Sequence, residues 1–173
     1  IEVRPIPEPP PEYPDATWFP AKSVELSENW SRAPDTLPAG EPITRHVTVT
    51  ALGQLSTQIP VIEPVDSDTV KVYPDKPELR VVAAAGGVLA TRKDQYAIIG
   101  VESGDVELPS LELPWWNIET EEWQVARLPE TTIRILPSAD ALPDPAAAAG
   151  QEAEPRPSPD ALVVHSTFWR RVS

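Results

Sequence analysis

Proline is the feature that most restricts how this chain can fold. The sequence has 23 prolines among 173 residues and only seven glycines. Each proline fixes φ and lacks a backbone N–H, so helix interiors and central strands are largely closed to it. Ten prolines fall in residues 1–42, seven in residues 43–136 and six in residues 137–173. This distribution predicts proline-rich, extended termini around a middle that can form regular structure.

Residues 1–16 form the first proline-rich arm. The stretch from Arg4 to Pro14 contains six prolines and predicts an extended polyproline II segment. Such a segment serves as a stiff spacer or as a docking peptide for an aromatic groove, and we favour the spacer. At the other end, residues 137–159 combine proline with a run of four alanines and predict a second linker. Residues 160–173 form a separate last segment, in which Asp160 could cap a short helix.

The middle of the chain, residues 17–136, follows a period of two. In residues 43–51, isoleucine, valine and alanine alternate with threonine and histidine, which is typical of a half-buried strand. The same reasoning predicts strands at 24–26, 58–62, 69–73, 88–101 (one strand or two), 106–113 and 131–136, and a hairpin over 116–126.

Seven to nine short strands without a useful helical segment predict an all-β fold. An immunoglobulin-like antiparallel β-sandwich is the natural solution, because two one-sided sheets bury their apolar faces against each other. A barrel is the weaker alternative, since glycines for its corners are few. Pro109 and Ser110 shift the alternation and indicate a bulge or kink.

Composition excludes several classes of function. The net charge of −13 disfavours binding to nucleic acid, and the absence of cysteine excludes disulfides and thiolate chemistry. His46 and His165 are far apart, so we expect no metal site. The acidic clusters (Asp66, Asp68; Glu119, Glu121, Glu122) are better interpreted as solvated rims than as a glycosidase pair or a calcium loop. We expect no cofactor and no enzymatic activity.

Adjacent tryptophans are the strongest candidate for a binding site. Trp115 and Trp116 must point to opposite faces of a strand, so one can fill the core while the other faces outward. The outward indole could stack on a sugar ring or bind a protein, or it could be covered by Trp18, Phe19 or Trp30 from the N-terminal part. Trp123 is placed to pair across the hairpin with one of the two indoles. The candidate interaction residues are therefore Trp115, Trp116, Asn117 and Trp123.

Several segments resemble a region of BatD proteins, the bacterial aerotolerance (oxygen tolerance) family. They are AKSVELSENW at 21–30, LPAGEPITRHVTVT at 37–50, KVYPDKP at 71–77, GDVELPSLELPWWN at 104–117, and Trp123 with ARLP at 126–129. The resemblance implies a periplasmic domain of an inner-membrane-anchored bacterial protein, without enzymatic activity. It also implies BatA/BatB-like von Willebrand factor A-domain proteins and a MoxR-type ATPase as partners. The chain begins without methionine, so we expect a fragment whose membrane helix lies beyond Ser173.

Three hypotheses for function follow. The first is a non-catalytic periplasmic interaction module of an envelope complex, and the resemblance favours it. The second is a carbohydrate-binding module that stacks peptidoglycan sugars on Trp115 or Trp116. The third is a hydrolase with an acidic site, which would need two carboxylates facing each other across a cleft.

Overall fold

The computed structural model describes residues 5–64 and 67–138, which belong to one compact unit. In these residues the chain is almost entirely β, with one short 3-10 helix, η1 (Ser56–Gln58). The strands are β1 (Pro20–Ala21), β2 (Ser23–Trp30), β3 (Thr36–Pro38), β4 (Pro42–Leu52), β5 (Val70–Pro74), β6 (Glu78–Ala84), β7 (Gly87–Gly100), β8 (Gly104–Leu108), β9 (Leu111–Asn117), β10 (Glu122–Leu128) and β11 (Thr131–Leu136).

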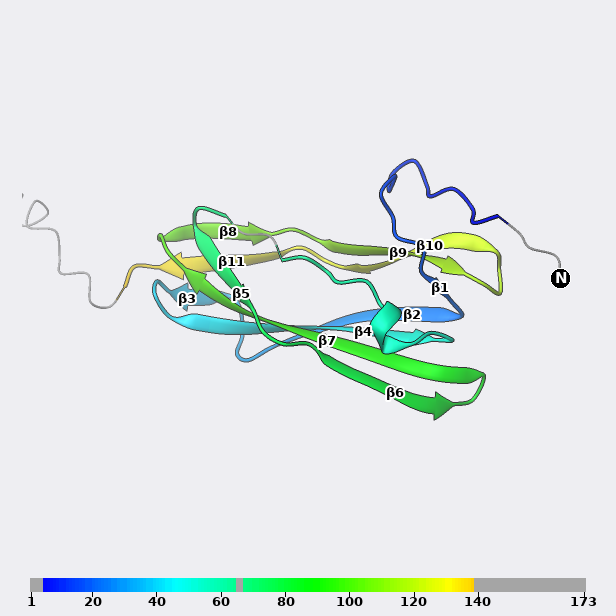
Figure 1. Ribbon diagram of the computed structural model, residues 1–173. Coiled ribbons are helices and arrows are strands. Elements are labelled where there is room, and N and C mark those ends of the chain that lie inside the picture. The colour runs from blue at the N-terminus through cyan, green and yellow to red at the C-terminus, as the bar shows by residue number, and fades with distance from the viewer. Residues whose placement is uncertain (1–4, 65–66, 139–173) are drawn as a thin grey trace, which may run out of the picture. The chain divides into compact units, whose positions relative to one another are not determined.

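The strands form two facing layers, which Figure 1 shows nearly edge-on. One layer is a sheet with the order β2-β4-β7-β5, and β6 pairs with β7 beside this path. The other layer consists of two three-stranded sheets, β1-β9-β10 and β3-β11-β8. Apart from the parallel pairs β1–β9 and β3–β11, the pairing is antiparallel. The predicted immunoglobulin-like antiparallel sandwich is thus confirmed.

Strand β4 lies in the middle of its sheet and shows why the alternation has structural meaning. Every second residue from Ile43 to Ala51 is buried, while the residues between them are half-buried on the outer face. Its antiparallel register with β7 runs without a break from Pro42 opposite Ile99 to Leu52 opposite Leu89. This long ladder is the framework on which the other strands are placed.

The two layers are packed together without disulfides, because the chain has no cysteine, and most of the side chains between them are apolar. One cluster joins Phe19 and Trp115 to the β4 residues Val49 and Ala51. A second cluster, around Ile43 and Ile98 on one layer and Ile133 and Ile135 on the other, fills the opposite end. A smaller group that includes Val47 and Tyr96 lies between them.

Three strands were not expected from the sequence, and one expected strand is absent. Residues 58–62 form the end of η1 and a loop instead of a strand, in which Pro60 has no N–H to donate to a ladder. Strands β1 and β3 have only two and three residues, too few to give a period. Strand β6 is exposed along its whole length and therefore shows no alternation. Residues 5–64 and 67–138 therefore contain eleven strands, against the seven to nine expected.

Two further predictions from the alternating pattern, for residues 88–101 and for the kink at Pro109 and Ser110, agree with the structure. Residues 88–100 of the segment expected at 88–101 belong to a single fourteen-residue strand, β7, which begins at Gly87. Pro109 and Ser110 separate β8 from β9, and the buried positions change from even numbers in β8 to odd numbers in β9. Because β8 pairs with β11 while β9 pairs with β10, this kink moves the chain from one sheet of its layer to the other.

The terminal segments agree only in part with their predicted forms. Residues 5–10 carry no helix or strand, but turns closed by Tyr13 N–H to Pro10 O (2.9 Å) and Ala16 N–H to Tyr13 O (3.0 Å) interrupt the polyproline II segment expected up to Pro14. The linker expected at 137–159 lies outside the described residues from 139 on, as does the whole segment 160–173. Within the described part of the chain, no helix is long and apolar enough to span a bilayer.

Gly100 of β7 lies tightly against Ile135 of the other layer. A Cβ atom at this position would lie 2.6 Å from Ile135 Cγ2 and 2.9 Å from Ile135 Cδ1. We expect Gly100→Ala to lower the free energy of unfolding by about 2 kcal/mol through overpacking, measured by urea unfolding. In an Ile135→Ala background the same substitution should cost almost nothing further, because the crowded atoms are gone. An equal cost in both backgrounds would contradict this explanation.

Candidate functional site

The two adjacent tryptophans lie on opposite faces of β9, as the alternation predicts. Trp115 is 5 % exposed and packs in the core beside Phe19 and Leu113. Trp116 points away from the core and is half-buried. Its register partner across the β9–β10 hairpin is Trp123. The outward indole is therefore Trp116, and its first neighbour comes from the hairpin itself.

A third indole, Trp18, completes an outward-facing group that we call the indole cluster (Trp18, Trp116 and Trp123). The ring centroids lie 5.6 Å apart for Trp18 and Trp116, 5.8 Å for Trp18 and Trp123, and 5.9 Å for Trp116 and Trp123. Both contacts of Trp123 are edge-to-face, with interplanar angles of 78° and 77°, an arrangement favoured by the ring quadrupoles. The three rings therefore pack in a favourable edge-to-face geometry around Trp123, and they also contribute apolar surface.

The proline-rich arm runs across this cluster. Trp123 Nε1–H donates a hydrogen bond of 2.8 Å to the carbonyl oxygen of Glu8. A shallow groove beside this contact is lined by prolines of the arm, indoles of the cluster and the turn of the hairpin: Pro5, Pro7, Trp18, Trp116, Ile118 and Glu121. The aromatic surface is therefore covered in part by an extended segment of the same chain.

A second contact fixes the arm farther along the chain. The Tyr13 hydroxyl donates to Glu112 Oε2 at 2.6 Å, and Arg127 donates to the Tyr13 oxygen at 3.2 Å and to Glu112 Oε1 at 2.9 Å. The hydrogen bond from Tyr13, with that from Arg127, lowers the pKa of Glu112 below its ordinary value. The hydrogen bonds among Tyr13, Glu112 and Arg127 thus attach residue 13 to β9 and β10, separately from the contact between Trp123 and Glu8.

Asn117, the remaining candidate, holds the hairpin turn. Its Oδ1 atom accepts hydrogen bonds from the backbone N–H groups of Glu119 (2.8 Å) and Thr120 (3.2 Å). The side chain is 8 % exposed, so these contacts satisfy a buried acceptor. The three acidic residues of this segment, at 119, 121 and 122, are exposed. Asn117 therefore positions the turn beside the indole cluster.

Sequence reasoning missed a charged residue inside the sandwich. Arg45 lies on the buried face of β4, between Ile43 and Val47, and is 6 % exposed. Its Nε–H donates to Glu28 Oε2 at 2.8 Å, its second nitrogen lies 2.7 Å from the same oxygen, and its guanidinium carbon lies 5.2 Å from the centre of the Trp30 ring. In the alternating pattern, Arg45 occupies the same face as the apolar residues Ile43 and Val47, and this position in the sequence already indicated an inward side chain.

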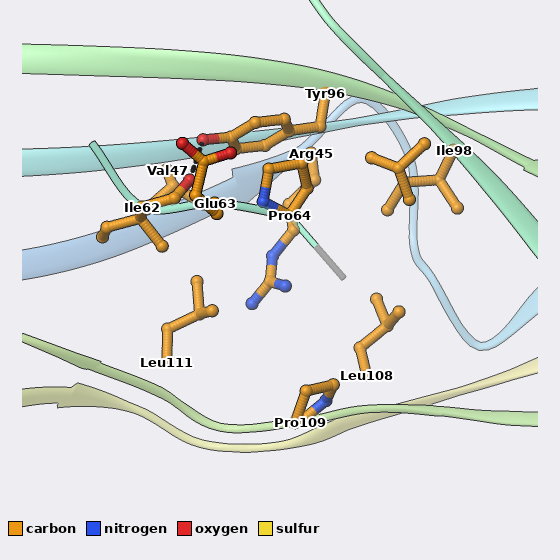
Figure 2. A pocket seen from close by; sticks show the side chains of 11 residues that line it. Arg45, Val47, Ile62, Glu63, Pro64, Tyr96, Ile98, Leu108, Pro109 and Leu111 are labelled. Atoms are coloured by element: carbon orange, nitrogen blue, oxygen red, sulfur yellow. Dashed lines mark hydrogen bonds between the residues drawn. The ribbon is translucent and has the colours of Figure 1, made fainter. Parts of the chain in front are cut away.

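The Arg45 guanidinium lies between the two layers, as Figure 2 shows, with Tyr96 on one side and Leu108 and Leu111 on the other. The adjoining cavity has a volume of only about 30 Å³ and is lined mostly by apolar side chains. A space of this size holds one or two water molecules and no organic substrate. Arg45 is therefore part of the interior structure.

Strand β7 carries a second inward-facing polar group. Arg92 donates two hydrogen bonds to the Asp94 carboxylate, at 2.8 and 2.9 Å, which further raise the pKa of Arg92. Farther along the same face, the Tyr96 hydroxyl donates to Ile62 O at 2.6 Å. Burial, with a smaller contribution from Asp94, raises the pKa of Tyr96 to about 12.

The raised pKa of Tyr96 makes stability depend on pH in the alkaline range. The folded state favours the neutral phenol, so this contribution is complete below the ordinary value of 10.0 and declines as the pH rises through about 12. We expect urea unfolding to show falling stability over this range, and phenolate absorbance to show that Tyr96 loses its proton only near pH 12. Tyr96→Phe should remove both effects; a late tyrosine that persists in this variant would contradict the assignment.

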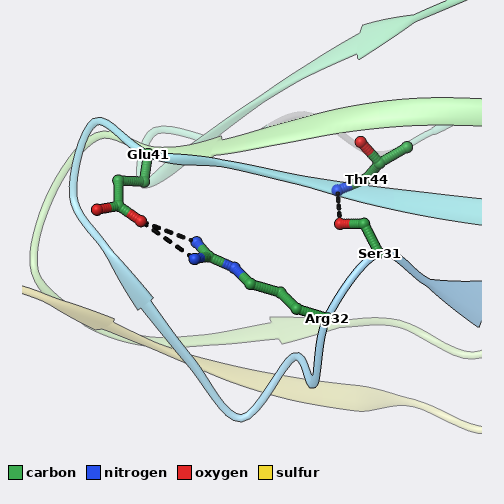
Figure 3. A network of polar contacts seen from close by, with 4 residues as sticks. All are labelled: Ser31, Arg32, Glu41 and Thr44. Carbon is green, nitrogen blue, oxygen red and sulfur yellow. Dashed lines mark hydrogen bonds and ion pairs between the residues drawn. The ribbon is translucent and has the colours of Figure 1, made fainter.

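The end of β2 is tied to β4 by the polar contacts in Figure 3. The Ser31 hydroxyl accepts a hydrogen bond of 3.0 Å from Thr44 N–H, and both terminal nitrogens of Arg32 lie 3.1 Å from Glu41 Oε2. Arg32 and Glu41 are 43 % and 54 % exposed, so this ion pair contributes little to stability. These contacts extend the ladder between the two strands and form no pocket.

Several exposed apolar side chains lie on the hairpin formed by β6 and β7. Leu79, Val81 and Val82 of β6 are 44–47 % exposed, and Val88 of β7 is 37 % exposed. Strand β6 pairs with β7 along one edge, and in the described part of the chain no strand pairs with its other edge. The hairpin therefore presents apolar side chains together with unpaired backbone groups.

The described residues contain no group of three or more His, Cys, Asp or Glu side chains that could hold a metal ion. His46 lies on the outer face of β4, opposite Asn29 on one side and Gln95 on the other. His165 and Asp66 lie outside the described residues.

Comparisons with protein-family models, with curated proteins and with solved structures give no match to this chain.

Proposed function

We propose that this chain is a non-catalytic protein-binding module of the bacterial cell envelope, of the kind found in BatD-like oxygen-tolerance proteins. It acts in the periplasm, within a protein anchored in the inner membrane, together with BatA/BatB-like von Willebrand factor A-domain proteins and a MoxR-type ATPase. The sequence resemblance supports this proposal. Its segments fall on strands β1 to β5 and β8 to β10, so it involves both layers of the sandwich.

The exposed edge of β6 is the observation that carries the proposal. Edge strands of soluble proteins are usually protected by charges, proline or a covering segment. Residues 81–84 of β6 are Val-Val-Ala-Ala, which provide neither charge nor proline, and both valines are exposed. Such an edge suits strand addition, in which the backbone of a partner supplies affinity and side-chain contacts supply specificity.

The indole cluster gives less support to peptidoglycan binding. A sugar ring stacks on a free aromatic face, whereas Trp116 contacts both Trp18 and Trp123 and is half-buried. We therefore rank a carbohydrate-binding module second. A fluorescence titration with peptidoglycan fragments tests it, and a saturable change in tryptophan emission that is lost in Trp116→Ala would favour it.

The experiment for the leading proposal is capture of partners from bacterial membranes with the full chain as bait. We expect a von Willebrand factor A-domain protein, identified by mass spectrometry, among the bound proteins. The double substitution Val81→Lys and Val82→Lys should reduce its recovery about tenfold or more, since charges would be buried at an apolar interface. Both side chains are exposed, so the fold should be retained.

Val101→Lys is the matched control, because Val101 is 51 % exposed and lies beyond the opposite end of β7. It should leave recovery unchanged. Equal recovery by the β6 variant and the unmodified chain would contradict the assignment of the surface. Failure to recover any von Willebrand factor A-domain protein would contradict the proposed partners.

A further inference from the structure

The contact between Trp123 and Glu8 has the chemistry of polyproline II recognition. Prolines at 5, 7, 9 and 10 fix φ, and each residue that precedes a proline is driven to an extended conformation. A chain in this conformation makes no internal hydrogen bonds, so its carbonyl groups remain available to a partner. Here one of them accepts the Trp123 indole N–H at 2.8 Å, beside a groove lined by aromatic and apolar side chains.

The aromatic side is formed by parts of the chain that are distant in sequence. Trp18 follows the arm, Trp116 lies on β9 and Trp123 on β10. The hairpin register places Trp116 opposite Trp123, and the Asn117 turn fixes the adjacent Ile118. The sandwich thus builds this surface, whereas residues 5–10 join no sheet and only lie against it.

Two contacts of different strength hold residues 5–16, the described part of the arm. Tyr13 forms hydrogen bonds with both Glu112 and Arg127, whereas Trp123 holds residues 5–10 by one neutral hydrogen bond, to the carbonyl oxygen of Glu8. One neutral hydrogen bond contributes little net free energy. Residues 5–10 can therefore leave the groove while the chain from Tyr13 onward stays in place.

We propose that the indole cluster is a binding site for proline-rich segments in the polyproline II conformation. Residues 5–10 occupy it in cis, and a proline-rich segment of a partner protein takes their place in trans. This site is distinct from the β6 edge, so the experiments can reject either binding site without rejecting the other. The protein thereby has a second docking surface that its own arm regulates by competition.

The test follows indole N–H signals by NMR in the full, ¹⁵N-labelled chain, with Trp123→Phe used to assign the Trp123 signal. The probe is the peptide Pro-Ile-Pro-Glu-Pro-Pro-Pro-Glu, which is residues 5–12 of this chain. The receptor is an arm variant of unchanged length (Pro5→Gly, Pro7→Gly and Pro9→Gly), whose arm is too flexible to compete well. We expect the peptide to shift the Trp123 signal saturably in this variant. The unmodified chain should respond more weakly, because its tethered arm is present at high effective concentration.

The controls separate recognition of polyproline II from unspecific contact. Placing Trp123→Phe in the arm variant, with binding followed on the indole signals of Trp18 and Trp116, should weaken peptide binding about fivefold, since it removes one hydrogen-bond donor and keeps an aromatic ring. Trp30→Phe, a similar change of a half-buried indole outside the cluster, should leave affinity unchanged. The same peptide with alanine at each proline should not bind.

Three results would overturn the proposal. One is the absence of a shift in the arm variant at millimolar peptide, and another is equal binding of the alanine peptide. The third is a dimer of the unmodified chain that forms with increasing concentration and is abolished by Trp123→Phe. In that case the occupant is the arm of a second copy and not a separate partner.

Discussion

Replacing Glu28 with glutamine is expected to lower the free energy of unfolding by about 3 kcal/mol. The reason is the position of Arg45, whose side chain is 7 % exposed and lies 2.7 Å from the Glu28 carboxylate. Without that negative charge, the guanidinium charge remains between the layers against a neutral amide and the Trp30 ring, which do not replace the ion pair. Glu28 itself is 19 % exposed, so water reduces the loss below that of a fully enclosed pair. Urea unfolding followed by circular dichroism measures the change.

Two comparisons identify the buried charge as the cause. The double variant Glu28→Leu and Arg45→Met removes both charges and should lie within about 1 kcal/mol of the unmodified chain. Glu41→Gln breaks the exposed pair with Arg32 and should change stability by less than about 0.5 kcal/mol. If Glu28→Gln behaves like Glu41→Gln, the ion pair is not part of the interior structure.

Phe19→Ala should be at least as damaging, with an expected loss of about 3–4 kcal/mol. Phe19 is 1 % exposed and packs against both layers, in the cluster with Val49 and Trp115. Its truncation leaves a cavity at the point where the arm joins β1. The backbone contact from Trp116 N–H to Phe19 O (2.9 Å) lies at the same point. Urea unfolding gives the loss, and indole NMR signals report whether Trp18 leaves the cluster.

Ile6→Ala is the matched control in the arm. Ile6 is 64 % exposed, so its truncation should change stability by less than about 0.5 kcal/mol. A loss for Phe19→Ala as small as that for Ile6→Ala would mean that the arm junction does not contribute to the core.

The fold was predictable where one face of a strand is buried. Alternation in residues 43–51 predicts β4 and its inward side chains, and the neighbouring indoles of β9 follow the same rule. Strand β6 could not be found in this way, because the residues on both of its faces are exposed. Residues 58–62 have strand-forming composition, but Pro60 has no N–H to donate to a ladder.

The candidate site was predictable only as a set of residue types. Sequence spacing placed Trp123 opposite an indole of β9, and the structure selects Trp116. The contacts of Trp18 and Glu8 with this pair depend on how the arm folds back over the hairpin, which local pattern does not encode. Arg45 was missed because a charged residue was not expected on a buried face, although its parity placed it there.

Hydrogen exchange of the backbone amides of β6 tests the central claim most directly, measured in the full chain alone and with a purified von Willebrand factor A-domain partner. In the free chain, amides on the open edge of β6 should exchange rapidly, while those of β4 should be protected on both sides. Binding by strand addition should slow exchange at the outward-facing amides of β6 and leave β4 unchanged. A complex that forms without any added protection in β6 would contradict the account.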